Sequence, residues 1–124
     1  MQSILIEGTH KLPSVHFDYV SGKLEIKGKS APEDSLKFYK PLLDWIAEYK
    51  AQPQLRTEVN LNLEYFNTAT SKCLTDVLKA IDAIYKAGNN ITLNWFYVDE
   101  FILEAGEDYQ SFLNIPFKMI PVEE

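Results

Sequence analysis

The 124-residue chain has few of the residues that build several common kinds of site. It has one cysteine, Cys73, which excludes an intramolecular disulfide and a cysteine-based zinc site. Only one of its 12 basic residues, Arg56, is an arginine, the residue best suited to bidentate capture of phosphate. Combined with a net charge of −6, this scarcity of arginine argues against binding of nucleic acid or anionic membrane lipid.

Motifs for nucleotide, metal and membrane chemistry are also missing. The 5 glycines are scattered and form neither G-x-G-x-x-G nor a P-loop. The 2 histidines, His10 and His16, lack a metal-ligand spacing, so we expect no metal and no cofactor. No apolar run approaches the ~20 residues of a membrane helix. Residues 1–8 lack the regions of a signal peptide, so we expect a cytoplasmic protein.

The composition that is present predicts one folded domain over residues 1–124. Hydrophobic residues make up 46% of the chain and aromatic residues 13%, which is enough for a buried core. The negative charge is unevenly placed, because residues 99–124 hold 7 of the 18 acidic residues and 1 of the 12 basic residues. Residues 1–98 are therefore neutral. The acidic segment either contacts a partner or faces water, and water is the default.

Hydrophobic periodicity predicts the order β-β-β-α-β-α-β-α-β. Strands are expected at 3–7, 14–20, 23–29, 57–66, 91–98 and 117–122, with a hairpin turn at Ser21-Gly22. Helices are expected from Ser30 to about residue 51, over 67–87 and over 99–114. Strand–helix–strand units imply parallel crossovers. The fold class is thus α/β, or mixed α+β, with a mixed sheet, an N-terminal hairpin and helices mainly on one face.

Three details of this prediction concern single residues. Ser30 can cap the first helix, with Glu33 in the capping-box position, and Pro41 should bend that helix. Strict alternation over 57–66 places Tyr65 on the same face as Leu63. The first helix presents a broad apolar face, which consists of Leu36, Phe38, Tyr39, Leu42, Leu43, Trp45, Ile46 and Tyr49.

The most informative segment joins the strand at 57–66 to the helix at 67–87. Asn67 or Thr68 can act as the N-cap of that helix. A helix N-terminus presents unpaired N–H groups and partial positive charge, so it tolerates a phosphate of about −1.5 to −2 charges. Thr68 is therefore a candidate phosphorylation site, and Thr70 and Ser71 are alternative acceptors on the same turn.

Other candidate groups have ordinary structural explanations. We expect Cys73 to be a buried packing residue, and a reactive thiolate near the helix N-terminus is the alternative interpretation. The run Trp95-Phe96-Tyr97 lies within a strand and favours core packing over base stacking. Carboxylates such as Glu64, Asp99 and Glu104 leave open a small enzyme or ligand-binding domain, although a solvated face explains them as well.

Several segments, taken in order, resemble the SiaC family of bacterial regulatory phosphoproteins. The first is Glu64-Tyr65-Phe66-Asn67-Thr68, followed at the same spacing by Ser71-Lys72. The others are residues 24–30 (LEIKGKS), 38–45 (FYKPLLDW), 94–97 (NWFY) and 104–108 (EAGED). The chain departs from the Ser-rich versions of the family at Ala69-Thr70, which adds Thr70 as a competing acceptor.

The resemblance implies a STAS-like domain and a non-enzymatic switch. A dedicated kinase would phosphorylate Thr68, and a PP2C-type phosphatase would remove the phosphate. The unphosphorylated form would bind and activate a GGDEF diguanylate cyclase, which raises cyclic di-GMP and promotes aggregation and biofilm growth. The expected partner-binding residues are Tyr65, Phe66, Asn67, Thr68, Thr70, Ser71 and Lys72. Because residues 1–98 are neutral, we expect these residues to form a neutral surface on which a new phosphate stands out.

Overall fold

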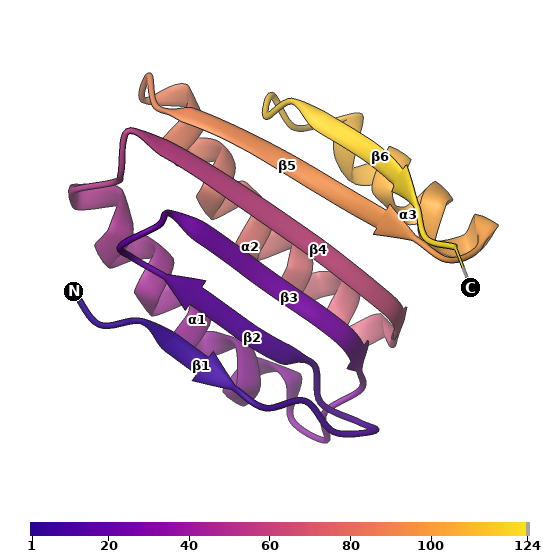
Figure 1. Cartoon of the computed structure of the whole chain (residues 1–124). Coiled ribbons are helices and arrows are strands. Elements are labelled where there is room, and N and C mark those ends of the chain that lie inside the picture. The colour runs from indigo at the N-terminus through magenta and orange to yellow at the C-terminus, as the bar shows by residue number, and fades with distance from the viewer. Residues whose placement is uncertain (124) are drawn as a thin grey trace.

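The computed structural model describes residues 1–123, in which three helices pack against one face of a six-stranded sheet (Figure 1). The predicted order of elements is confirmed. The elements are β1 (Ile4–Ile6), β2 (Ser14–Asp18), β3 (Lys23–Ser30), α1 (Ser35–Ala51), β4 (Arg56–Phe66), α2 (Thr68–Lys86), β5 (Asn90–Tyr97), α3 (Glu100–Gln110) and β6 (Phe117–Pro121). Within the described residues, none of the helices has the length and apolarity needed to span a bilayer.

The strands follow one another across the sheet in sequence order. β1, β2 and β3 pair antiparallel, which confirms the N-terminal hairpin. β3, β4, β5 and β6 pair parallel, and each of these connections contains a helix. The carboxyl ends of four parallel strands therefore meet at one edge of the sheet, where the next helices begin (Figure 1). In parallel sheets this edge is the usual place for binding residues.

The two faces of the sheet differ sharply in polarity. The helix-covered face supplies a continuous core, in which the largest fully buried side chains include Trp95, Tyr39, Tyr49 and Phe17. The opposite face bears a polar row that crosses the sheet through paired positions: His16, Glu25, Asn60, Asn94 and Lys118. In this row the Asn94 Nδ2 donates to the Asn60 Oδ1 at 2.8 Å.

The start of α1 differs from the prediction. Asp34, not Ser30, caps the helix, and its Oδ1 accepts a hydrogen bond from the Lys37 backbone N at 3.1 Å. Ser30 is instead the last residue of β3 and is fully buried. α1 continues through Pro41 from Ser35 to Ala51. Leu36, assigned above to the apolar face of this helix, is 75% exposed.

The end of β4 also departs from strict alternation. Gly28 pairs with Leu63 and Lys29 with Tyr65, so Glu64 is an extra residue without a partner in β3. Such a bulge reverses the phase of the side chains that follow it. Tyr65 is consequently half-exposed, and Phe66 turns into the core in its place. The prediction that Tyr65 shares a face with Leu63 is wrong for this reason.

Candidate functional site

Thr68 is the first residue of α2 and is exposed. Asn67 is the N-cap, because its Oδ1 accepts a hydrogen bond from the Thr70 backbone N at 2.9 Å. The Asn67 backbone N donates to the Ser30 carbonyl at 3.2 Å, which ties the start of α2 to the end of β3. Thr68 thus stands on a fixed turn with its hydroxyl group at the surface.

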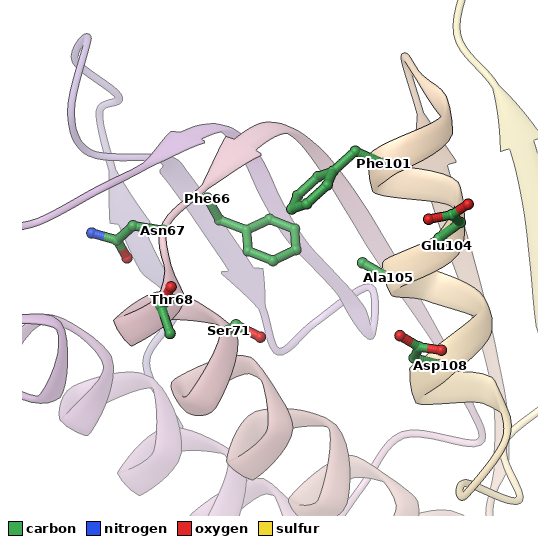
Figure 2. A pocket seen from close by; sticks show the side chains of 8 residues that line it. All are labelled: Phe66, Asn67, Thr68, Ser71, Phe101, Glu104, Ala105 and Asp108. Carbon is green, nitrogen blue, oxygen red and sulfur yellow. The ribbon is translucent and has the colours of Figure 1, made fainter.

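A cleft of about 290 Å³ lies between α2 and α3, beside Thr68 (Figure 2). Figure 2 shows the rings of Phe66 and Phe101 turned toward each other, and their centroids are 6.4 Å apart. The complete lining is Phe66, Asn67, Thr68, Ser71, Phe101, Glu104, Ala105 and Asp108. We call this the α2–α3 cleft.

Buried contacts fix α3 in the position that forms this cleft. The Tyr109 Oη donates to the Ser71 carbonyl of α2 at 2.8 Å. Burial raises the pKa of this phenol, so it remains a neutral donor. The Trp95 Nε1 of β5 donates to the Ile102 carbonyl at 2.8 Å. Gly106 lies against the same indole, where a Cβ would stand only 2.4 Å from Nε1.

A second cleft, of about 540 Å³, lies between the starts of α1 and α2. Thr68 and Leu36 both line it, so Thr68 lies on the ridge between two clefts. The complete lining is Glu33, Asp34, Ser35, Leu36, Thr68, Ala69, Lys72, Cys73 and Asp76. We call this the α1–α2 cleft.

The two alternative phosphoacceptors are less exposed than Thr68, and both form hydrogen bonds within the protein. Thr70 is fully buried, and its Oγ1 donates to the Ser30 carbonyl and lies 3.0 Å from the Ser30 Oγ. The Ser30 Oγ in turn pairs with the Tyr39 Oη at 2.7 Å. Burial raises the pKa of Tyr39 to about 12. Ser71 is half-buried, with its Oγ 3.1 Å from the Tyr109 Oη. Thr68 is therefore the most exposed of these three hydroxyl-bearing residues.

Cys73 is 2% exposed and packs in the core, as the simpler interpretation predicted. Burial raises the pKa of its thiol, with smaller contributions from Asp76 and Asp34. A raised pKa keeps the sulfur protonated near neutral pH, which opposes the chemistry of a reactive thiolate.

The surface around Thr68 is acidic, contrary to the neutral surface expected from the sequence. Glu104 and Asp108 of α3 line one cleft. The other cleft is lined by Glu33, Asp34 and Asp76, with Lys72 as its cationic member. The acidic segment at 99–124 thus reaches Thr68, because α3 packs beside α2.

The carboxylates considered for acid–base chemistry are not gathered into one site. The Asp99 Oδ1 caps α3 by accepting a hydrogen bond from the Ile102 backbone N. Glu104 lines the α2–α3 cleft. Glu64 lies in a different hollow, beside Lys27 and Asn62. Nor, among residues 1–123, do three or more His, Cys, Asp or Glu side chains group as metal ligands would.

Comparison with protein-family models matches residues 6–122 to the SiaC family of regulatory phosphoproteins. The chain belongs to the SiaC family. An uncharacterized protein of Pseudomonas aeruginosa strain UCBPP-PA14 is 29% identical to this chain over 119 residues, which cover 94% of each protein. The resemblance inferred from the sequence is therefore confirmed.

Solved structures of SiaC share this fold throughout. Apo-SiaC from Pseudomonas aeruginosa is 28% identical and superposes with a TM-score of 0.90, covering 97% of this chain and 99% of that one. The activator SiaC bound to the diguanylate cyclase SiaD of the same organism is also 28% identical, with a TM-score of 0.90 over 96% of this chain and 99% of that one. The expected fold class is confirmed.

The structure places beside Thr68 several residues that the expected partner-binding set does not contain. They are Leu36 and Asp34 at the start of α1, Asp76 further along α2, and Phe101, Glu104 and Asp108 on α3. Apart from Asp76, they lie far from residues 64–72 in sequence, so no local motif could join them. One signal was available, since residues 104–108 carried part of the resemblance to the SiaC family without a stated role.

Proposed function

We propose that this SiaC-family protein is a non-enzymatic switch that binds and activates a GGDEF diguanylate cyclase while Thr68 is unphosphorylated. A cognate kinase phosphorylates Thr68 and ends binding, and a PP2C-type phosphatase restores it. The resulting change in cyclic di-GMP controls aggregation and biofilm growth. The activator SiaC in complex with the cyclase SiaD supports the choice of partner, because that SiaC shares the fold of this chain.

The observation that carries the proposal is the exposed Thr68 hydroxyl between two clefts with apolar side chains at their rims. Phe101 is 64% exposed in the α2–α3 cleft, and Leu36 is 75% exposed in the α1–α2 cleft. Tyr65 at the end of β4 is half-exposed as well. We call Leu36, Tyr65, Thr68, Lys72 and Phe101 the Thr68 surface. Exposed aromatic and aliphatic side chains around a polar centre are typical of protein docking sites.

Phosphorylation at this position would act directly on docking. A partner that covers Leu36 and Phe101 also covers Thr68, which lies between the clefts that these side chains line. A phosphate there adds about −1.5 to −2 charges to a surface that already carries several carboxylates. Burying that charge without compensation costs several kcal/mol, and ~3 kcal/mol weakens binding over a hundredfold.

The test compares charge at two threonines on opposite faces of the protein. Thr92 is exposed. It lies on the helix-free face of the sheet, because its neighbours Ile91 and Leu93 point into the core and side chains alternate along a strand. We expect Thr68→Asp to weaken cyclase binding at least about tenfold, or ~1.4 kcal/mol, in calorimetry. Thr92→Asp, which adds the same charge, should leave the affinity unchanged, and Thr68→Ala should bind but resist the kinase. Equal effects of the two aspartates, or full kinase labelling of Thr68→Ala, would remove the basis of the proposal.

A further inference from the structure

Lys72 is the cationic neighbour of Thr68 on α2. The two residues are four positions apart, so they lie one turn apart on the same face, with Cβ atoms about 5–6 Å from each other. Both are exposed, and both line the α1–α2 cleft. Within residues 1–123 the ion pairs are Lys40–Asp44 and Lys86–Asp82, so the Lys72 ammonium group has no carboxylate partner there.

The other charged groups near Thr68 are carboxylates, and they are distributed unequally around it. The α2–α3 cleft contains Glu104 and Asp108, and none of its eight lining residues is basic. The α1–α2 cleft contains Glu33, Asp34 and Asp76 but also Lys72. Asp34 is engaged in capping α1. Asp76 lies four residues beyond Lys72 and competes with Thr68 for that ammonium group.

A phosphate on Thr68 therefore has unequal surroundings on its two sides. Toward α3 it faces like charges alone, which raise its energy. Toward α1 it also meets carboxylates, but the same cleft contains the Lys72 ammonium group, which lies one helical turn away and forms no ion pair among the described residues. Charge-assisted hydrogen bonds from ammonium to phosphate are short and strong relative to neutral ones.

We propose that, in the phosphorylated form, Lys72 holds the Thr68 phosphate over the α1–α2 cleft while Glu104 and Asp108 keep it out of the α2–α3 cleft. This inference rests on the proposed function for the identity of the modified residue. It means that the phosphate covers the side of the Thr68 surface that contains Leu36. The side that contains Phe101 keeps its chemistry, so a partner senses phosphorylation through the α1–α2 cleft.

The test measures the second pKa of the phosphate by ³¹P NMR in protein that carries phosphothreonine at position 68, installed during synthesis without a kinase. A cation at the phosphate favours the dianion and lowers this pKa. We expect Lys72→Gln to raise it by roughly 0.3 unit, the size of an exposed pair four residues apart on a helix. Asp76→Asn should lower it by releasing Lys72, and Glu104→Gln should change it by less than Lys72→Gln.

Lys79→Gln provides the matched control. Lys79 is an exposed lysine of α2 whose Nζ lies 5.9 Å from the ring centroid of Phe112. It lies about 16 Å further along the helix axis than Thr68, beyond the Debye length in physiological salt. The phosphate pKa should therefore not respond to its loss. Far-UV circular dichroism checks that each variant is folded.

Two results would overturn the inference: equal pKa values in Lys72→Gln and Lys79→Gln, or a larger response to Glu104→Gln than to Lys72→Gln. Both are independent of the kinase and the cyclase. If phosphorylated protein binds the cyclase as tightly as unphosphorylated protein, the proposed function fails while the placement of the phosphate stands. If phosphorylation abolishes cyclase binding but Lys72→Gln leaves the phosphate pKa unchanged, the proposed placement of the phosphate fails and the proposed function stands.

Discussion

Replacing Gly106 with alanine has two opposite effects on the free energy of unfolding. Alanine has the higher helix propensity, but its Cβ atom would clash with the core, and the structure predicts that the clash is the larger effect. Gly106 lies within α3, where alanine is ordinarily more favourable by about 1 kcal/mol. The new Cβ would, however, stand 2.4 Å from Trp95 Nε1, 2.5 Å from Cδ1 and 2.8 Å from Cε2. Carbon contacts prefer about 3.5 Å, so α3 or the indole must shift by roughly 1 Å.

The indole has little freedom to make that shift. Trp95 is 1% exposed, its Nε1 is bonded to the Ile102 carbonyl at 2.8 Å, and its ring packs against Phe66 and Tyr109. Overpacking costs about 1–3 kcal/mol, and stretching the hydrogen bond adds about 1 kcal/mol. After the gain in propensity, we expect Gly106→Ala to lower the free energy of unfolding by about 1–3 kcal/mol.

Urea denaturation at constant m-value measures this change. Gln110→Ala, at an exposed position of the same helix, is the control and should stay within about 0.5 kcal/mol of wild type. The sharper test repeats Gly106→Ala in a Trp95→Phe background, where the smaller ring gives the Cβ room and the cost should fall by about 1 kcal/mol. The packing argument is refuted if Gly106→Ala stabilises the protein, or if its cost is the same in both backgrounds.

Three further predictions concern buried polar groups. Thr70→Val should lower the free energy of unfolding by about 1–3 kcal/mol, because the buried hydroxyl and carbonyl groups of Ser30 each lose one hydrogen-bond partner; a neutral result in urea denaturation would contradict the buried network. Cys73 should react with a disulfide reagent at pH 8 far more slowly in folded protein than in urea, and equal rates would show an accessible thiolate. The pKa of Tyr39 is near 10 in the unfolded chain and is raised to about 12 in the folded protein. Between these pH values the unfolded state binds fewer protons, so the free energy of unfolding falls by up to ~1.4 kcal/mol per pH unit. Tyr39→Phe should flatten that alkaline slope, as measured by denaturation between pH 9.5 and ~11.5; an unchanged slope would assign it to other groups.

Local patterns were sufficient for much of the fold and for the position of Thr68. The alternation in β4 and the 3.6-residue period in α2 each reflect one buried face. Both elements can therefore be predicted from the sequence without knowing what covers that face. Asn67 was recognised as a candidate cap because capping is decided within four residues. The end of α2 is decided just as locally, because Gly88 follows the helix with a φ of +101°, a conformation that glycine adopts readily.

Two local predictions failed where a distant contact decided the outcome. Ser30 has the chemistry of a helix cap, but its hydroxyl group is used by Tyr39 and Thr70 in the core, and Asp34 caps α1. Tyr65 follows the alternation of β4 on paper, but the extra residue Glu64 reverses the phase. A bulge depends on how the neighbouring strand pairs, which the sequence of one strand does not contain.

The sequence by itself determined the order of the elements, the family resemblance and the presence of a phosphorylatable threonine at a helix start. Only the tertiary structure decided what surrounds that threonine. Packing of α3 beside α2 brings Glu104 and Asp108 from the acidic segment to Thr68, while packing of α1 brings Leu36 and Asp34 to its other side. The electrostatic field at a residue depends on distances in space, so charge counted along the chain placed a neutral surface where the folded protein has an acidic one.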